Sequence, residues 1–390
     1  MGTASTTAPA TGIEPFTINV SPYIIEDLRE RLGRARWPDE IPGSGWRYGA
    51  NKTYLQQLCA HWGHGFDWKE QEELLNGFRH FRMTIDGLGL HFIRQKGAGP
   101  HRVPILLLHG YPDSFFRFLK LIPLLTEPGP GDQSFDVVVP SMPGYGFSDR
   151  PTKPGMNVVR IAALYARLME RLGYDKYMVH GGDIGSLVAR ELAHAHPERV
   201  IALHLTEVPF QHLFTLPADQ LSAPEEEWLR TGAMWQRTEG AYNLLQSTKP
   251  DTLAFALNDS PIGLAAWIIE KFHGWTDHSG DLEEIYTRNE LLVNLTIYWV
   301  TQTAASAFRL YYETAQQPAP SAKRLKTPVA ILIAARELVP APREAADRIF
   351  NVVQWNELPH GGHFLAMERP KDLAADLFCL AATLAPGTRE

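Results

Sequence analysis

The sequence has few cysteines, no long apolar run and no surplus of basic residues. Its two cysteines, Cys59 and Cys379, are too few for a disulfide framework and lack the spacing of metal ligands, which slightly favours a reducing compartment. No run of about 18 apolar residues occurs, so no membrane span is expected. The formal net charge of −7 comes without any basic stripe, which argues against a nucleic-acid or anionic-membrane surface. We therefore expect a soluble, cytoplasmic protein without a nucleic-acid partner.

The amino terminus also lacks the apolar core of a signal peptide. Residues 1–12 are polar and small, and we expect a flexible leader there. Gly2 and Thr6 fit the loose pattern for N-myristoylation, but that pattern is permissive and the polar leader is the simpler interpretation.

The rest of the chain alternates between strand-like and helix-like segments. Residues 13–80 contain two stretches with helical spacing of apolar residues, and residues 81–95 indicate a β-hairpin. Short β-rich runs that predict strands lie at 103–109, which should be fully buried, and at 135–141, 176–182, 199–206, 327–334 and 352–359. Helix-like segments such as 158–172 lie between them, which favours a parallel sheet wrapped by helices.

The alternation is interrupted once, between about residue 207 and residue 327. Residues 210–315 are aromatic and helical in pattern, with no obvious strand. We therefore predict an α/β fold whose core is formed by residues 81–207 and 321–390. Residues 208–320 form a helical cap inserted into that core.

One stretch, "MVHGGDIGSLVAR" (residues 178–190), predicts a sharp turn between a strand and a helix. The glycines at 182 and 185 and the position of Asp183 resemble the G-x-S-x-G nucleophile elbow of α/β-hydrolases, with aspartate in place of serine. Aspartate and glycine are also common in ordinary turns. The strand before and the helix after favour a nucleophile.

In this fold the nucleophile is followed along the chain by an acid and then a histidine. "LPHGGHF" offers His360 and His363 after the last predicted strand, and Glu337 follows the strand before it. Glu207, just past the strand at 199–206, is an alternative acid. A metal is not expected at the other paired histidines, which lack nearby cysteines or a shared carboxylate: His61 with His64, and His194 with His196.

The stretch "LLLHGYPDSFF" follows a buried strand, where this fold places a loop of the oxyanion hole. Tyr111 and Ile184, the residue after the candidate nucleophile, are the expected backbone N–H donors. A plain structural turn is the alternative interpretation of this loop.

Several longer motifs resemble the microsomal type of epoxide hydrolases. They include "RARWPDEIPGSGWRYG", "SMPGYGFS", "TKPDTLAFALNDSPIGLAAWIIEKF", "YWVTQTAASAFRLYYE" and "PHGGHF". The resemblance as a whole runs from about residue 15 to residue 380. The resemblance implies an α/β-hydrolase core with a mostly parallel sheet, and an amino-terminal extension over residues 13–80 that packs on cap and core.

The resemblance also implies roles for individual residues. Asp183 stands at the nucleophile, His363 at the base and Glu337 at the acid. Tyr242 and Tyr311 stand at the two cap tyrosines that activate the epoxide oxygen.

The sequence departs from the family pattern at several positions. Ala334 and Ala335 replace the usual Phe-Pro before the acid, Tyr111 replaces a tryptophan, and Ile184 replaces a tryptophan that commonly follows the nucleophile. Tyr312 lies one step off the tyrosine pattern. Both tryptophan replacements should reshape the pocket wall without removing a backbone donor.

An epoxide explains why the nucleophile is a carboxylate. Serine attacking a saturated carbon would form an ether, whereas aspartate forms an ester that water can cleave at its acyl carbon. We thus predict conversion of a small apolar epoxide and water into a vicinal diol, without metal or organic cofactor. An apolar pocket is expected from the cap aromatics Trp228, Trp235, Trp267 and Trp299, with Pro112 in its wall. A homodimer is possible.

Two other functions remain open from the sequence. A haloalkane-type dehalogenase also forms an ester on aspartate, but it needs donors for the departing halide, and Ile184 with the tyrosine pair favours an epoxide. A non-catalytic ligand receptor on the same scaffold is the second, because fold does not fix function.

Overall fold

The computed structural model describes residues 12–209, 218–317 and 323–384. The predicted leader therefore lies, except for Gly12, outside the described residues, as do Gly2 and Thr6. The structure is built on one nine-stranded sheet in the order β1-β2-β3-β5-β4-β6-β7-β8-β9. The strands are β1 (Ile13–Phe16), β2 (His80–Ile85), β3 (Leu88–Gln95), β4 (His101–Leu108), β5 (Gln133–Pro140), β6 (Tyr177–Gly181), β7 (Val200–Leu205), β8 (Pro328–Ile333) and β9 (Asn351–Glu357).

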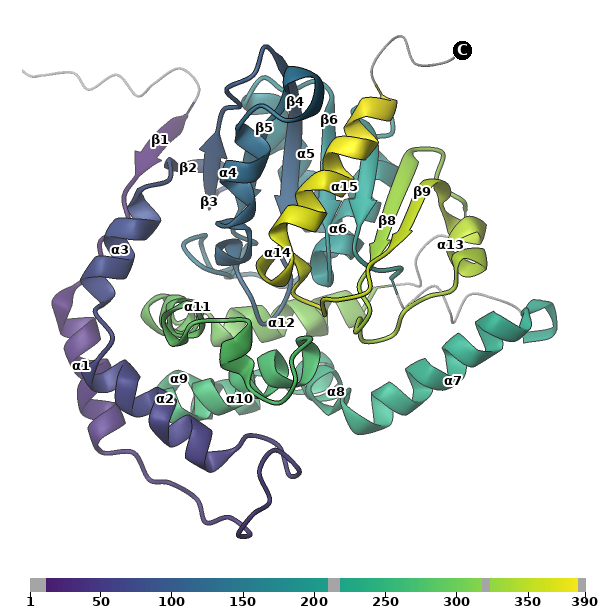
Figure 1. Ribbon diagram of the computed structural model, residues 1–390. Helices are drawn as coiled ribbons and strands as arrows, with labels where there is room; N and C mark the ends of the chain where they lie inside the picture. Colours follow the sequence, from purple (N-terminus) through teal and green to yellow (C-terminus); the bar gives the residue numbers. More distant parts are fainter. Residues whose placement is uncertain (1–11, 210–217, 318–322, 385–390) are drawn as a thin grey trace, which may run out of the picture.

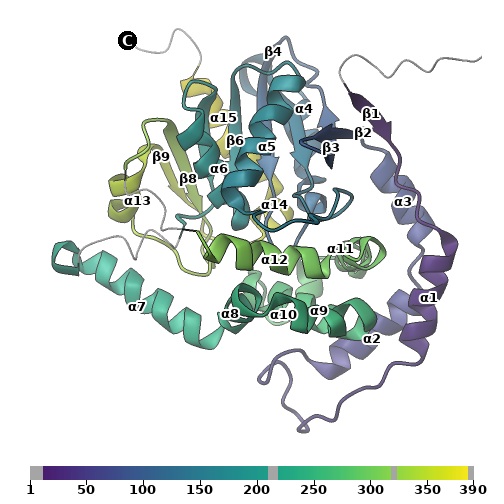
Figure 2. The same ribbon diagram turned by 180° about the vertical axis from the view of Figure 1, so that it is seen from behind.

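From β5 through β9 the strands run parallel, whereas β1, β2 and β3 join the sheet antiparallel. The central strands are apolar along most of their length because helices cover both faces. α4 (Leu121–Thr126) and α15 (Pro370–Thr383) lie on one face, and α5 (Val158–Arg171) and α6 (Ile184–Ala195) lie on the other (Figures 1 and 2).

A layer of helices lies across the carboxyl ends of the parallel strands (Figure 1). They are α7 (Ala223–Thr238), α8 (Ala241–Thr248), α9 (Pro250–Asp259), α10 (Pro261–Trp275), α11 (Arg288–Thr301) and α12 (Ala304–Ala315). No strand interrupts the described part of this insertion between β7 and β8. α12 packs against α8 and α9, so the two tyrosine-bearing helices, α8 and α12, are neighbours.

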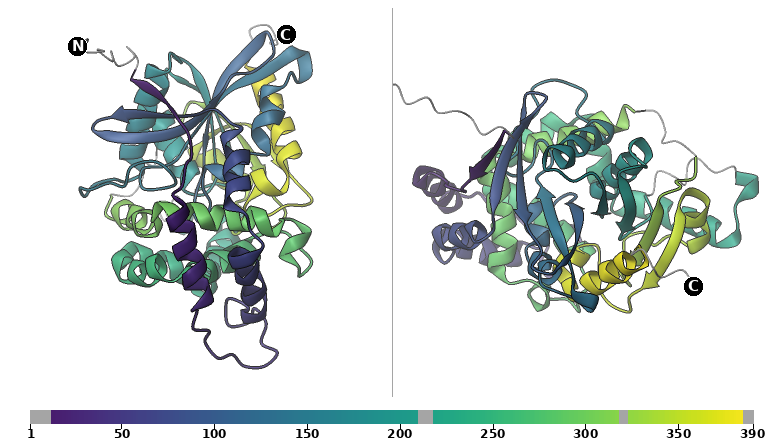
Figure 3. Two further views of the ribbon diagram at one scale, coloured as in Figure 1. Left: turned by 90° about the vertical axis from the view of Figure 1, so that its left-hand side faces the viewer. Right: turned by 90° about the horizontal axis from the view of Figure 1, so that it is seen from above.

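The amino-terminal segment connects the sheet to these cap helices. β1 adds a strand at the sheet edge, and α1 (Pro22–Gly33), α2 (Lys52–His64) and α3 (Trp68–Asn76) follow it. Figure 3 shows α1 and α2 beside the cap. The Trp62 indole donates to the hydroxyl of Thr296 on α11 at 2.9 Å, and Arg31 forms an ion pair with Asp259 at 2.6 Å. The pattern of apolar residues in this segment indicated helices but not the short β1, which pairs with β2 and packs Phe16 against His91 and Phe147.

The remaining helices are α13 (Arg343–Ile349) and α14 (Leu365–Glu368). Within the described ranges, no single helix combines the length and apolar composition needed to cross a membrane. α9 and α10 meet both conditions only as a pair, and they are bent by 116° at their junction.

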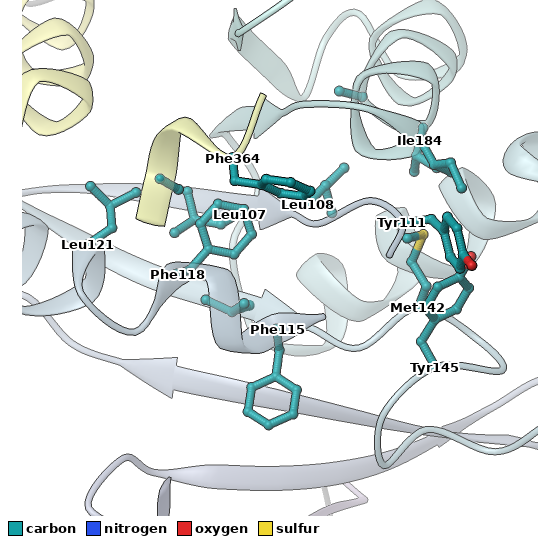
Figure 4. Packing of buried hydrophobic residues seen from close by; sticks show 14 of the residues in the cluster. Leu107, Leu108, Tyr111, Phe115, Phe118, Leu121, Met142, Tyr145, Ile184 and Phe364 are labelled. Atoms are coloured by element: carbon teal, nitrogen blue, oxygen red, sulfur yellow. The ribbon is translucent and has the colours of Figure 1, made fainter. Parts of the chain in front are cut away.

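The apolar core reaches the carboxyl end of β4, where the candidate site begins. Figure 4 shows Leu107 and Leu108 packed among aromatic side chains, with Tyr111 and Ile184 farther along. All four are buried. Packing on this scale holds the loops after the strands at fixed positions, which a site of converging side chains requires.

Candidate active site

Asp183 occupies a strained turn between β6 and α6. Its φ is +54° and its ψ is −134°, a conformation that residues with a side chain rarely adopt. Neighbouring glycines make the turn possible, because a Cβ on Gly185 would collide with the carbonyl of Leu108 and one on Gly110 with Asp183 itself. The carboxylate is thereby raised above the end of the sheet, where side chains from other loops can reach it.

The loops after β8 and β9 bring an acid and a histidine to this carboxylate. A parallel β-bridge joins Arg336 to Gly362, so the residues that follow them, Glu337 and His363, lie side by side. Nδ1 of His363 is 2.8 Å from Oε1 of Glu337, and its Nε2 is 3.4 Å from Oδ2 of Asp183. His363 is 3% exposed, whereas His360 is exposed to solvent.

The pKa values in this cluster follow from the three neighbouring charges. Burial lowers the pKa of His363, but the carboxylates of Glu337 and Asp183 outweigh it and hold that pKa well above its usual value. Burial raises the pKa of Asp183, and the charge of His363 with the N–H groups of Ile184 and Tyr111 brings it below its usual value. The resting site is therefore an anionic Asp183 beside a protonated His363.

Two backbone N–H groups bind the nucleophile carboxylate. The N–H of Tyr111 donates to Oδ1 of Asp183 at 2.9 Å, and the N–H of Ile184 contributes from the first turn of α6. Both predicted donors thus lie at the candidate nucleophile. They are placed to stabilise negative charge on Oδ1.

Tyr242 on α8 and Tyr311 on α12 face the elbow from the cap. Their ring centroids are 6.0 Å apart, and both rings contact the ring of Tyr111. Burial raises the pKa of each phenol well above its usual value, so both hydroxyls remain proton donors. Tyr312 is 39% exposed and lies outside the lining of the cavity described next.

A cavity of about 320 Å³ connects these groups. Asp183, Glu337, His363 and both cap tyrosines line it, together with apolar side chains that include Val158, Leu187, Leu310 and Val339. Of the predicted pocket residues, only Trp235 lines this cavity. The carbonyl of Pro112 accepts the Asn294 amide at 2.8 Å, and the Trp267 side chain lies by the Tyr111 hydroxyl.

Glu368 positions the histidine loop, although no sequence motif pointed to it. Its carboxylate accepts three backbone N–H groups, from Gly362 at 2.8 Å, Phe364 at 2.9 Å and Asp277 in the cap at 3.0 Å. The first two residues flank His363, whose own N–H donates to the carbonyl of Trp275 at 2.8 Å. A carboxylate that accepts backbone N–H groups leaves no mark in the sequence, because these contacts form only when the loop has folded.

One group of described residues has a spacing that could hold a metal: Glu207, Glu337 and His363, with ligand atoms within 4.8 Å of one another. A hydrogen bond already joins two of these three side chains. The paired histidines do not form such a group; His61, for example, bonds to Asn289 at 2.8 Å. The described geometry therefore suits an acid–base site.

The sheet order and the placement of acid and histidine after β8 and β9 are those of enzymes of the α/β-hydrolase fold. A family described as "alpha/beta hydrolase fold" matches residues 103–244. A second family, "Epoxide hydrolase N terminus", matches residues 13–118.

Individual relatives cover nearly the whole chain. Epoxide hydrolase 1 of Oryctolagus cuniculus is 38% identical over 94% of this chain and 88% of the relative. The crystal structure of juvenile hormone epoxide hydrolase from Bombyx mori has a TM-score of 0.84 at 32% identity, covering 95% of this chain and 94% of the other. The structure of Aspergillus niger epoxide hydrolase has a TM-score of 0.82 at 29% identity, covering 97% and 99%. The chain belongs to the epoxide hydrolase family, which confirms the predicted fold and enzyme class.

Proposed function

We propose that the enzyme opens an epoxide by forming a covalent ester on Asp183. The observation that carries this proposal is the placement of one carboxylate between two buried phenols and a histidine within a single cavity. Oδ1 is bound by backbone N–H groups, which leaves Oδ2 to attack a carbon of the epoxide ring. As the carbon–oxygen bond breaks, Tyr242 and Tyr311 stabilise the departing oxygen, and one phenol transfers its proton to it.

The ester is then hydrolysed at its acyl carbon. Esterification removes the charge of Asp183, so His363 passes the proton that it holds at rest to the phenolate left by ring opening. Neutral His363, oriented by Glu337, then takes a proton from water as the hydroxide adds to the Asp183 acyl carbon. The N–H groups of Tyr111 and Ile184 stabilise the oxyanion on Oδ1. Collapse expels the diol oxygen, which takes the proton from His363, and the regenerated carboxyl group returns its proton to His363, which restores the resting site. Protons and bonds balance with side chains and water alone.

The walls of the cavity support a small apolar epoxide as substrate. Apolar side chains form much of the lining, and a volume of about 320 Å³ is at the lower end of ligand pockets. The predicted division into leader, extension, core and cap remains a proposal, as do a homodimer, a cytoplasmic location and pocket roles for Trp267 and Pro112.

Isotope transfer would test the ester directly. With enzyme in excess over one apolar epoxide in ¹⁸O-water, the first turnover should place the label in the Asp183 carboxylate and not in the diol. Label in the first-turnover diol would mean direct attack of water and would refute the ester. A parallel panel of chloroalkanes tests the dehalogenase alternative, which predicts halide release.

A further inference from the structure

Glu207 lies in the wall of the catalytic cavity but has no part in the proposed mechanism. It follows β7, and Ser186 on α6 stands between it and the nucleophile. Oγ of Ser186 is 2.6 Å from Oε1 of Glu207 and also 2.6 Å from the backbone oxygen of Asp183. A line of three oxygen atoms therefore joins a carboxyl group of the cavity to the backbone of the nucleophile.

The number of protons available to these three oxygen atoms indicates the protonation state of Glu207. A serine hydroxyl has one proton to donate, and the backbone oxygen of Asp183 can only accept. If Ser186 donates to that oxygen, its own Oγ must accept a proton from Glu207, which is then a neutral carboxylic acid. With Glu207 ionised, one of the two 2.6 Å contacts would join oxygens with no proton between them.

The surrounding charges favour the same state. The described polar and titratable groups around Glu207 are Ser186, Asp183, Glu337, His363 and Tyr242. Burial, followed by the charge of Glu337, raises the pKa of Glu207 to about 7. With Glu207 neutral and Asp183 esterified, Glu337 is the anionic carboxylate that remains bonded to the His363 ring.

We propose that Glu207 is a positioning residue, held as a neutral acid, that anchors the nucleophile turn through Ser186 and limits the negative charge beside the base. This role rests on the proposed function, since it concerns the hydrolytic half of that reaction. When Glu207 loses its proton at higher pH, the added negative charge stabilises protonated His363. A protonated histidine cannot take a proton from water, so ester hydrolysis responds to the ionisation of two groups.

Glu207→Gln removes the ionisable group at this position but keeps the size of the side chain. The amide still donates to Ser186 but cannot ionise, and a neighbouring charge typically moves a pKa by roughly one to three units. Hydrolysis of a preformed ester in this variant should therefore begin to rise at a pH lower than in the wild type by roughly one unit. The experiment measures the rates of ester formation and ester hydrolysis separately, in single turnovers from about pH 6 to about pH 9. The shift in pH dependence should appear in the rate of ester hydrolysis.

Three further variants make the test specific. Glu207→Met, also neutral but without a donor, should show the same shift in pH dependence. Ser186→Ala removes the link but keeps the carboxyl group, so it should slow ester formation while hydrolysis still responds to an ionisable Glu207. Glu198→Gln, at a glutamate whose side chain is 66% exposed, should match the wild type throughout.

Two results would overturn the role of Glu207. One is a hydrolysis profile in both neutral variants that coincides with the wild-type profile. The other is accumulation of the ester at every pH in Glu207→Gln, which would make Glu207 the acid of the triad. Failure of the wild-type enzyme to form an ester with any epoxide would instead refute the proposed function.

Discussion

Removing one hydroxyl of the cap tyrosine pair should slow ring opening without abolishing it. Tyr242→Phe and Tyr311→Phe each delete one O–H group and keep the ring, so the aromatic contacts with Tyr111 are preserved. The Tyr311 hydroxyl is buried and has no hydrogen-bond partner among the described residues. Its loss should therefore cost little stability, and the effect should fall on the reaction.

The expected magnitude follows from the burial of both phenols. Tyr242 is 5% exposed, so its hydrogen bond to the developing alkoxide forms with little competition from water. Removing one such transition-state donor typically costs about 2.7–4 kcal/mol, roughly a hundredfold to a thousandfold in rate. The remaining phenol can still donate, so each single variant should lie near the smaller value. The double variant should lose roughly ten-thousandfold or more, although the apolar walls should still bind the epoxide.

The assay is the rate at which the ester-linked enzyme appears by mass spectrometry in a single turnover. Tyr312→Phe provides the control, because Tyr312 neighbours Tyr311 but lies outside the cavity lining, and its rate should stay near wild type. Single variants that react at the wild-type rate would refute the role of the pair. A slow Tyr312→Phe beside an unaffected Tyr311→Phe would show that the wrong tyrosine of the two has been assigned.

Other changes test the remaining groups. Asp183→Ala should abolish diol formation, and more than trace turnover in the purified variant would contradict the ester. His363→Gln should accumulate an adduct with the mass of one substrate, and the absence of both adduct and slowed turnover would favour His360. Glu337→Gln should slow ester hydrolysis less severely than His363→Gln. If Glu207→Gln slows hydrolysis more than Glu337→Gln does, Glu207 and not Glu337 is the acid that orients His363. Because the folded-state pKa of His363 is raised, its ion pairs stabilise the protein fully below the usual histidine pKa of about 6.5 and are lost as pH rises through the folded value. Urea unfolding should thus show that His363→Gln lowers the free energy of unfolding relative to the wild type, most strongly at acidic pH and less at alkaline pH. A loss of stability that does not change with pH would contradict this.

Much of the fold could be predicted from the order of apolar runs. All six predicted strands are present, with ends displaced by at most a few residues. Five of them contain runs of buried residues, because strands covered on both faces need nearly continuous apolar sequence, whereas β9 at the sheet edge is half-buried or exposed. The short edge strand β1 was not predicted. Its pattern is exposed or half-buried, and it forms by pairing with β2, a contact between residues about 70 positions apart.

The turn that carries the candidate nucleophile could also be predicted, because glycines and an aspartate between a strand and a helix are local features. The choice between Glu337 and Glu207 could not be made from the residues alone, since both follow strands of the sheet. Tertiary structure separates them: Glu337 bonds to His363 at 2.8 Å, whereas Glu207 bonds to Ser186 at 2.6 Å.

The sequence by itself determined the fold class, the elbow at Asp183 and the set of acids, histidines and tyrosines available for chemistry. These depend on local conformation, on the alternation of apolar segments and on motifs that resemble a family. Only the tertiary structure decided which side chains line the cavity, so Trp235 is in its lining and Trp267 is not. It also decided that Glu368 holds the histidine loop and that the Ser186 hydroxyl lies between Glu207 and the backbone of Asp183. Such relations join atoms from distant segments at distances of about 3 Å, and that proximity arises only when the sheet and the cap pack together.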